Sequence, residues 1–127
     1  MPRNWRIFEE ALPPTKDAIY ASINSVGELL LNKHAYDLID RPEAVIMMHE
    51  PETYSIGIQK AERMMPNAFK VRKKSDATNY VIRAKPFCDH LEIKYERTVR
   101  FLDAKLEDGV LAINLTKTTR VTRKKRP

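Results

Sequence analysis

The stretch INSVGELLLNKHAYDLI, residues 23–39, decides the fold. It contains the end of a strand, a turn at NSVG, a returning strand ELLLN and then a short polar-apolar run. Asn and Gly in the turn tolerate left-handed backbone conformations, and Asn32 is a suitable N-cap for a helix. The stretch therefore predicts a β-hairpin followed by a helix of about two turns, which Pro42 ends.

The flanking sequence extends this hairpin and helix into a ββαββ unit, which is then followed by a similar one. Alternating apolar residues predict strands at 18–24, 28–32, 43–50 and 54–61 in the first unit. The second unit has predicted strands at 69–74, 79–84, 97–106 and 110–116, with a helix at 85–93. We infer an internal duplication, with units at 19–61 and 69–116 joined by a linker at 62–68. The alternative is a small α+β domain whose alternating strands resemble one another only by chance.

Length and composition predict a single α+β, β-rich domain over residues 1–127. With 43% apolar residues, a chain of 127 residues has enough for one core but not for two independent ones. Residues 1–18 place Trp5, Phe8 and Leu12 at helical spacing before a Pro-Pro break, which predicts a short arm laid on the domain. Residues 117–127 form a basic tail.

The first unit resembles the SpoVT/AbrB-like swapped-hairpin family, which includes MazE- and MraZ-type proteins. The matching features are Gly27-Glu28 at the hairpin, the apolar strand 29–31, the helix through Ala35 and Leu38, and the strand 45–47. In that family one unit is too small to bury its own core, so two units interdigitate. The resemblance implies a degenerate tandem repeat packed as an intrachain pseudo-dimer with a swapped-hairpin, barrel-like arrangement. It also implies DNA binding and transcription regulation.

The net charge of +6 is concentrated in two short segments. All 17 acids lie at or before Asp108 and six bases follow it, so the rest of the chain is neutral. A second basic cluster lies at residues 60–74, which hold six bases against the single acid Glu62. Local basic patches on a neutral body are suited to bind a polyanion through salt-sensitive phosphate contacts.

The second hairpin and the tail form the candidate nucleic-acid-binding site. In the family that the chain resembles, DNA contacts lie largely on the first hairpin of each unit, but residues 19–28 contain no Lys or Arg. Binding of DNA or RNA must therefore fall to the second unit and the tail. The predicted binding residues are Lys70, Arg72, Lys73, Lys74, Arg83, Arg120, Arg123, Lys124, Lys125 and Arg126.

A protein-interaction module without a nucleic-acid role is the alternative function. In that case edge strands, or the arm around Trp5 and Phe8, bind another protein chain. The two functions predict different placements of the basic hairpin residues 70–74. Nucleic-acid binding is favoured if these residues lie on the same face as the start of the tail near Thr116. The interaction module is favoured if these residues and the start of the tail lie on opposite faces. Both a monomer and a homodimer are compatible with the sequence.

No residue pattern predicts an enzyme, a metal site or a cofactor. Cys88 and His90 are two positions apart, so on a helix they point about 200° apart and do not form a nucleophile and base pair. The three His residues lack a ligand spacing, and a single Cys excludes a Cys-rich zinc site. The isolated glycines exclude a Gly-rich phosphate-binding loop.

We expect a cytoplasmic protein without membrane contact. The single cysteine fits a reducing compartment. No stretch approaches the roughly 20 apolar residues that span a bilayer. The N-terminal segment carries acids where a signal peptide needs an apolar run.

Overall fold

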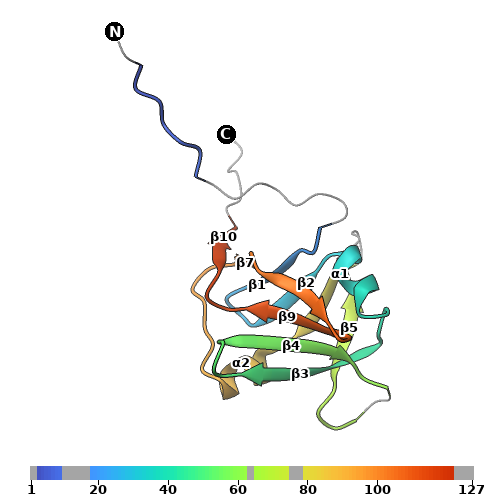
Figure 1. Ribbon diagram of the computed structural model, residues 1–127. Helices are drawn as coiled ribbons and strands as arrows, with labels where there is room; N and C mark the ends of the chain where they lie inside the picture. The colour runs from blue at the N-terminus through green and yellow to red at the C-terminus, as the bar shows by residue number, and fades with distance from the viewer. Residues whose placement is uncertain (1–2, 10–17, 63–64, 75–78, 122–127) are drawn as a thin grey trace.

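The computed structural model describes residues 3–9, 18–62, 65–74 and 79–121. These residues form one 10-stranded antiparallel sheet, curled into a half-barrel, with two short helices (Figure 1). The strands are β1 (Ala21–Ile23), β2 (Glu28–Leu31), β3 (Ala44–Glu50), β4 (Ser55–Lys60), β5 (Phe69–Lys73), β6 (Tyr80–Arg83), β7 (Val99–Phe101), β8 (Ala104–Glu107), β9 (Val110–Asn114) and β10 (Thr118–Arg120). The helices are α1 (Lys33–Leu38) and α2 (Lys85–His90). The β-rich α+β class is confirmed.

Alternating burial explains why the sheet curls around one core. In β2 the side chains of Leu29 and Leu31 are fully buried, whereas Leu30 between them is half-buried on the other face. Leu111 and Ile113 of β9 follow the same pattern. In these strands the apolar face turns toward the inside of the curl, and the alternate residues form an outer face.

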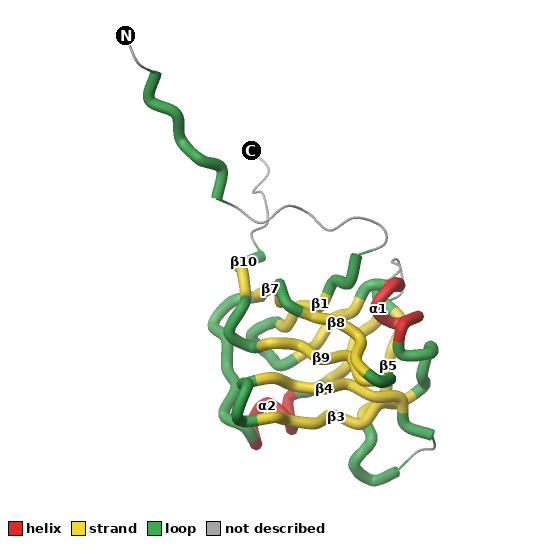
Figure 2. The backbone as a smooth tube through the Cα atoms, viewed as in Figure 1, coloured by secondary structure: helices red, strands yellow, loops and turns green. Residues whose placement is uncertain are grey.

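The two helices add to the core from well-separated positions, α1 at the right and α2 at the lower left of Figure 2. Asn32 caps α1 as predicted, because its Oδ1 accepts a hydrogen bond from the Ala35 amide at 2.9 Å. Ala35 and Cys88 are the buried residues of the two helices. Tyr36 of α1 stacks on Tyr80 of β6 with ring centroids 3.7 Å apart, which fixes α1 against the sheet.

The two hairpins that begin the predicted units lie side by side. The strand order is β10-β7-β1-β2-β6-β5-β3-β4-β9-β8, and β2 pairs with β6. The strand after each helix crosses over, because β3 pairs with β5 and β7 pairs with β1. The central part of the order is β7-β1-β2-β6-β5-β3. If β1, β2 and β3 are exchanged with β5, β6 and β7, the same order is obtained, read from its other end.

The prediction of one strand at 97–106 is wrong. The chain breaks at Leu102 and Asp103 into β7 and β8, which lie toward opposite ends of the strand order. The core side chains Phe101 and Ala104 are three positions apart, so an extra residue interrupts the alternation. The neighbouring segment breaks at the same place, between β9 and β10. Two backbone hydrogen bonds hold the bend: the Leu102 amide donates to the Lys117 carbonyl at 2.8 Å, and the Asn114 amide donates to the Asp103 carbonyl at 2.9 Å. The bent ribbon thereby connects the two ends of the curled sheet.

Two further predictions need correction at the chain ends. The tail does not begin at residue 117, because Thr118–Arg120 form β10 on the edge of β7. The arm is not laid on the domain over the part that is described, since residues 3–9 form no helix and Trp5 is 79% exposed. Leu12 lies outside the described residues.

Candidate nucleic-acid interface

Strand β5 presents basic side chains because its apolar residues face the core. Phe69 and Val71 pack against the core, so Lys70 and Arg72 point to the outer face. Lys74 continues the same alternation, and its amide donates to the Asn79 carbonyl at 2.9 Å. Lys73 is exposed but belongs to the inward side of the alternation at the end of the strand. Three of the four predicted bases in residues 70–74 therefore share one face.

Arg83 extends the basic surface onto β6. Ile82 is fully buried, so its neighbour Arg83 turns outward, where it lies opposite Glu28 of β2. The Glu28 carboxylate accepts a hydrogen bond from Asn24 Nδ2 at 2.9 Å. Glu28 is thus oriented by the hairpin turn and lies next to the basic residues.

A row of directly opposed residues crosses the outer face from β5 to β10. It joins the second hairpin, the first hairpin and the strand that precedes the tail. The successive residues are Arg72, Val81, Leu30, Ser22, Arg100 and Thr119. The strands are therefore hydrogen-bonded without interruption from the basic hairpin to β10, although Ser22 in the middle of this row is only 4% exposed.

Arg100 is a member of this face that the sequence analysis missed. Its guanidinium lies 5.4 Å from the centroid of the Tyr20 ring, a cation–π arrangement that holds the half-buried side chain. The signal in the sequence is its position between Val99 and Phe101, both of which are buried. In a strand this spacing sends Arg100 to the opposite, outer face.

The outer face is electrically asymmetric. From β7 to β5, Glu28 is the only acid among the described strand residues that point outward, whereas the outward bases of these strands are Lys70, Arg72, Arg83 and Arg100, with Lys74 directly after β5. Over β3, β4, β9 and β8 the balance reverses, with Glu50, Asp103 and Glu107 around Lys105. One half of the face is therefore suited to anions and the other half is not.

The tail residues are only partly placed with this basic face. Arg120 lies opposite Val99, a core residue, so it belongs to the inward side of β10 and not to the face of Lys70 and Arg72. Arg123, Lys124, Lys125 and Arg126 lie outside the described residues. The structure thus brings together Lys70, Arg72, Lys74 and Arg83, and separates Lys73 and Arg120 from them.

No protein-family model, curated protein or solved structure matches this chain. Neither helix in the described part of the chain is long and apolar enough to cross a membrane. Across the same residues, no three His, Cys, Asp or Glu side chains are grouped so that they would hold a metal ion.

Cys88 and His90 are not arranged for catalysis. Cys88 is buried, and burial together with the charge of Asp89 raises the pKa of its thiol. His90 is exposed at the end of α2. A buried thiol with a raised pKa is a poor nucleophile at neutral pH, which fits a packing role for Cys88.

Proposed function

We propose that this protein is a non-enzymatic, regulator-like nucleic-acid-binding protein that uses the outer face of β7-β1-β2-β6-β5. The observation that carries the proposal is the charge of that face, where the described outward bases outnumber the single acid Glu28. Each base placed on a phosphate of DNA or RNA releases a counterion, so several such contacts sum to measurable affinity. Phosphate contacts of this kind position a protein without reading sequence.

The spread of the bases supports contacts to several phosphates at once. Arg72 on β5 and Arg100 on β7 lie four strands apart in the sheet order. With about 4.8 Å between neighbouring strands, the path between them along the curled face is about 19 Å. Arg123, Lys124, Lys125 and Arg126 follow β10 in the sequence and add four bases to those available to a nucleic acid.

The fold proposal that accompanies this function is a tandem repeat of two ββαββ units, 19–61 and 69–116, packed as a swapped-hairpin pseudo-dimer similar to SpoVT/AbrB-like proteins. The symmetric central strand order and the crossover of β3 and β7 support it. The units differ in charge, because the first hairpin lacks bases and the second carries them. Binding is thereby assigned to one side of the pseudo-dimer.

Fluorescence anisotropy of a labelled random duplex, titrated with the full chain at several salt concentrations, tests the proposal. We expect micromolar binding at low salt. In Lys70→Gln and Arg72→Gln the slope of log affinity against log salt should fall by about one for each base removed. Lys105→Gln, on the acidic half of the outer face, is the matched control and should leave the slope unchanged. Absence of binding at low salt would contradict the proposal. An equal decrease of the salt slope in all three variants would contradict it as well.

A protein-interaction module is the second candidate function. It is favoured by the large apolar side chains that residues 3–9 expose, with Trp5 at 79%, Ile7 at 85% and Phe8 at 68%. Edge strands β8 and β10 also present unpaired backbone groups in the sheet order. This function predicts that the duplex anisotropy stays flat at low salt.

A further inference from the structure

A groove of about 530 Å³ opens on the outer face of β3, β4, β9 and β8. Its floor is formed by Gly57 and Ala112, which are directly opposed between β4 and β9. Met48 lies opposite Gly57 on β3, and a Cβ built on Gly57 would lie 2.9 Å from Val110 Cγ1. The floor is therefore apolar, and because Gly57 and Ala112 have little or no side chain, a bound group can approach the backbone of β4 and β9 closely. The volume of the groove falls in the range of about 300–1,000 Å³ typical of ligand sites.

One end of the groove is polar. Glu50, Ser55 and Asn114 are opposed in turn across β3, β4 and β9. Thr53 Oγ1 donates to Glu50 Oε1 at 2.5 Å. Asn114 Oδ1 accepts from both the amide and the hydroxyl of Thr116, at 2.8 and 2.6 Å. Glu50 Oε1 and Asn114 Oδ1 are therefore held in place at this end of the groove by the donors of Thr53 and Thr116.

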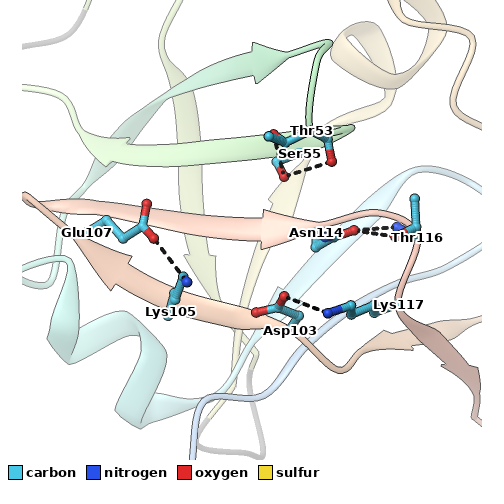
Figure 3. Close-up of polar contacts among 8 residues, drawn as sticks. All are labelled: Thr53, Ser55, Asp103, Lys105, Glu107, Asn114, Thr116 and Lys117. Carbon is cyan, nitrogen blue, oxygen red and sulfur yellow. Dashed lines mark hydrogen bonds and ion pairs between the residues drawn. The ribbon is translucent and has the colours of Figure 1, made fainter.

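The charge of the groove selects a cation and repels phosphate. Its lining contains the carboxylates of Glu50, Asp103 and Glu107, against one lysine, Lys105. Lys105 pairs with Glu107 at 3.3 Å, and Lys117 pairs with Asp103 at 3.6 Å (Figure 3). Both pairs are exposed and therefore weak, so another cation can replace them at small cost. Glu50 makes no ion pair among the described residues, which makes it the carboxylate most available to an incoming cation.

Residues 3–9, RNWRIFE, have the complementary chemistry. Trp5, Ile7 and Phe8 are the three most exposed large apolar side chains among the described residues. Arg3 and Arg6 add two cations, and the Arg3 guanidinium lies 5.7 Å from the Trp5 ring centroid. This segment combines apolar side chains for the floor with guanidinium groups for the carboxylates.

We propose that the groove binds residues 3–9 of a second copy of this chain, so that two copies exchange their arms. The apolar side chains of the arm contact Met48, Gly57 and Ala112, and an arginine pairs with Glu50. In the single chain Trp5 and Phe8 stay uncovered, so the groove is not filled by its own arm. Exchange about a two-fold axis fills both grooves and covers both arms with one self-complementary contact. The contact is independent of nucleic-acid binding, which uses the other half of the outer face.

The fluorescence of Trp5 tests this directly, because it is the only tryptophan of the chain. Full-length protein is diluted over a wide concentration range, and its emission maximum is compared with its mass from light scattering. We expect the emission to shift to the blue as the mass doubles, because the indole leaves water. Glu50→Gln removes one exposed charge pair in each of the two grooves, so at about fivefold for each pair it should weaken self-association roughly 25-fold. Glu52→Gln, exposed in the adjacent turn, is the matched control and should leave it unchanged.

A second variant tests the floor of the groove. Ala112→Arg introduces a large cation at its centre and should abolish both the blue shift and the dimer, while circular dichroism confirms that the variant is folded. A monomer with water-exposed Trp5 at every concentration overturns the proposal. So does a blue shift that does not depend on concentration, which would place the arm on its own chain. A dimer whose Trp5 stays exposed, or one that survives in folded Ala112→Arg, would mean that the copies meet elsewhere.

Discussion

Gly27 shows how one residue can be required for two separate reasons. Its backbone is left-handed, with φ of +81°, and a Cβ there would lie 2.8 Å from the Cα of Lys85 at the start of α2. The Gly27 carbonyl also accepts a hydrogen bond from the Ala84 amide at 2.9 Å. Gly109 has nearly the same φ, +80°, but a Cβ there would have no described atom within 4 Å. Both glycines are therefore required for the left-handed backbone conformation, but only Gly27 is also required for the close approach of the Lys85 backbone.

Gly27→Ala is expected to destabilise the protein more than Gly109→Ala. The left-handed conformation costs a residue with a Cβ about 1–2 kcal/mol in either variant. At Gly27 the contact with the Lys85 backbone adds about 1–3 kcal/mol, because the hairpin and α2 must separate. Urea denaturation of both variants measures the difference in the free energy of unfolding. An equal decrease of the free energy of unfolding in the two variants would show that a methyl group at residue 27 does not clash with Lys85.

Sequence reasoning recognised the turn at Gly27 but not its contact with α2. Turn formation depends on neighbouring residues, so the pattern NSVG was sufficient to predict it. The approach of Lys85 depends on the pairing of β2 with β6, a contact between the two hairpins that no local pattern encodes. The same distinction applies to Arg100: its outward direction follows from alternation, as for Lys70 and Arg72, but its place on the same face as theirs follows from the pairing of β7 with β1.

At the scale of elements, strands with a regular two-residue period were predicted well and interrupted strands were not. Hairpin β1–β2, helix α1 and strands β3 to β6 lie within a few residues of their predicted positions. The bend at Leu102 was missed because an extra residue in a strand leaves no residue type that marks it. Strand β10 was missed because TTR has no buried residue and forms only by pairing with β7.

Asn32 links helix α1 to the segment that enters β1, so its replacement should destabilise both. Its Oδ1 accepts from the amides of Ala35 and Tyr20 at 2.9 and 3.1 Å, and its Nδ2 donates to the Ala18 carbonyl at 2.7 Å. Asn32→Ala should lower the free energy of unfolding by about 2 kcal/mol, through loss of the cap and of the two further bonds. Asn67→Ala, at an exposed turn, is the control and should change it by less than about 0.5 kcal/mol in the same urea titration. Similar small changes in both variants would contradict the linking role of Asn32.

At the scale of the molecule, the sequence located the basic residues but not the surfaces that they share. The segment 60–74 was correctly identified as basic, and Arg83 was predicted with it, but the face also includes Arg100 of β7, which was not predicted. The acidic groove was not predicted, because Glu50 and Asp103 belong to segments that come together only when β9 pairs with β4 and β8. Strand order depends on long-range pairing, and many orders are compatible with the same alternating strands.

The crossed pairing makes the two halves of the chain depend on each other for folding. β1 and β2 need β7 and β6 as neighbours, and β3 needs β5, so each half leaves core strands with unpaired edges when it is alone. We expect the fragments 1–64 and 65–127 to lack a cooperative urea transition separately and to regain one when mixed in equal amounts. Near-ultraviolet circular dichroism of the mixture and of each fragment measures this, with the intact chain as the reference. A fragment that unfolds cooperatively as a monomer would show that its own strands suffice for a core, and the proposed packing as a pseudo-dimer would then lose its physical reason.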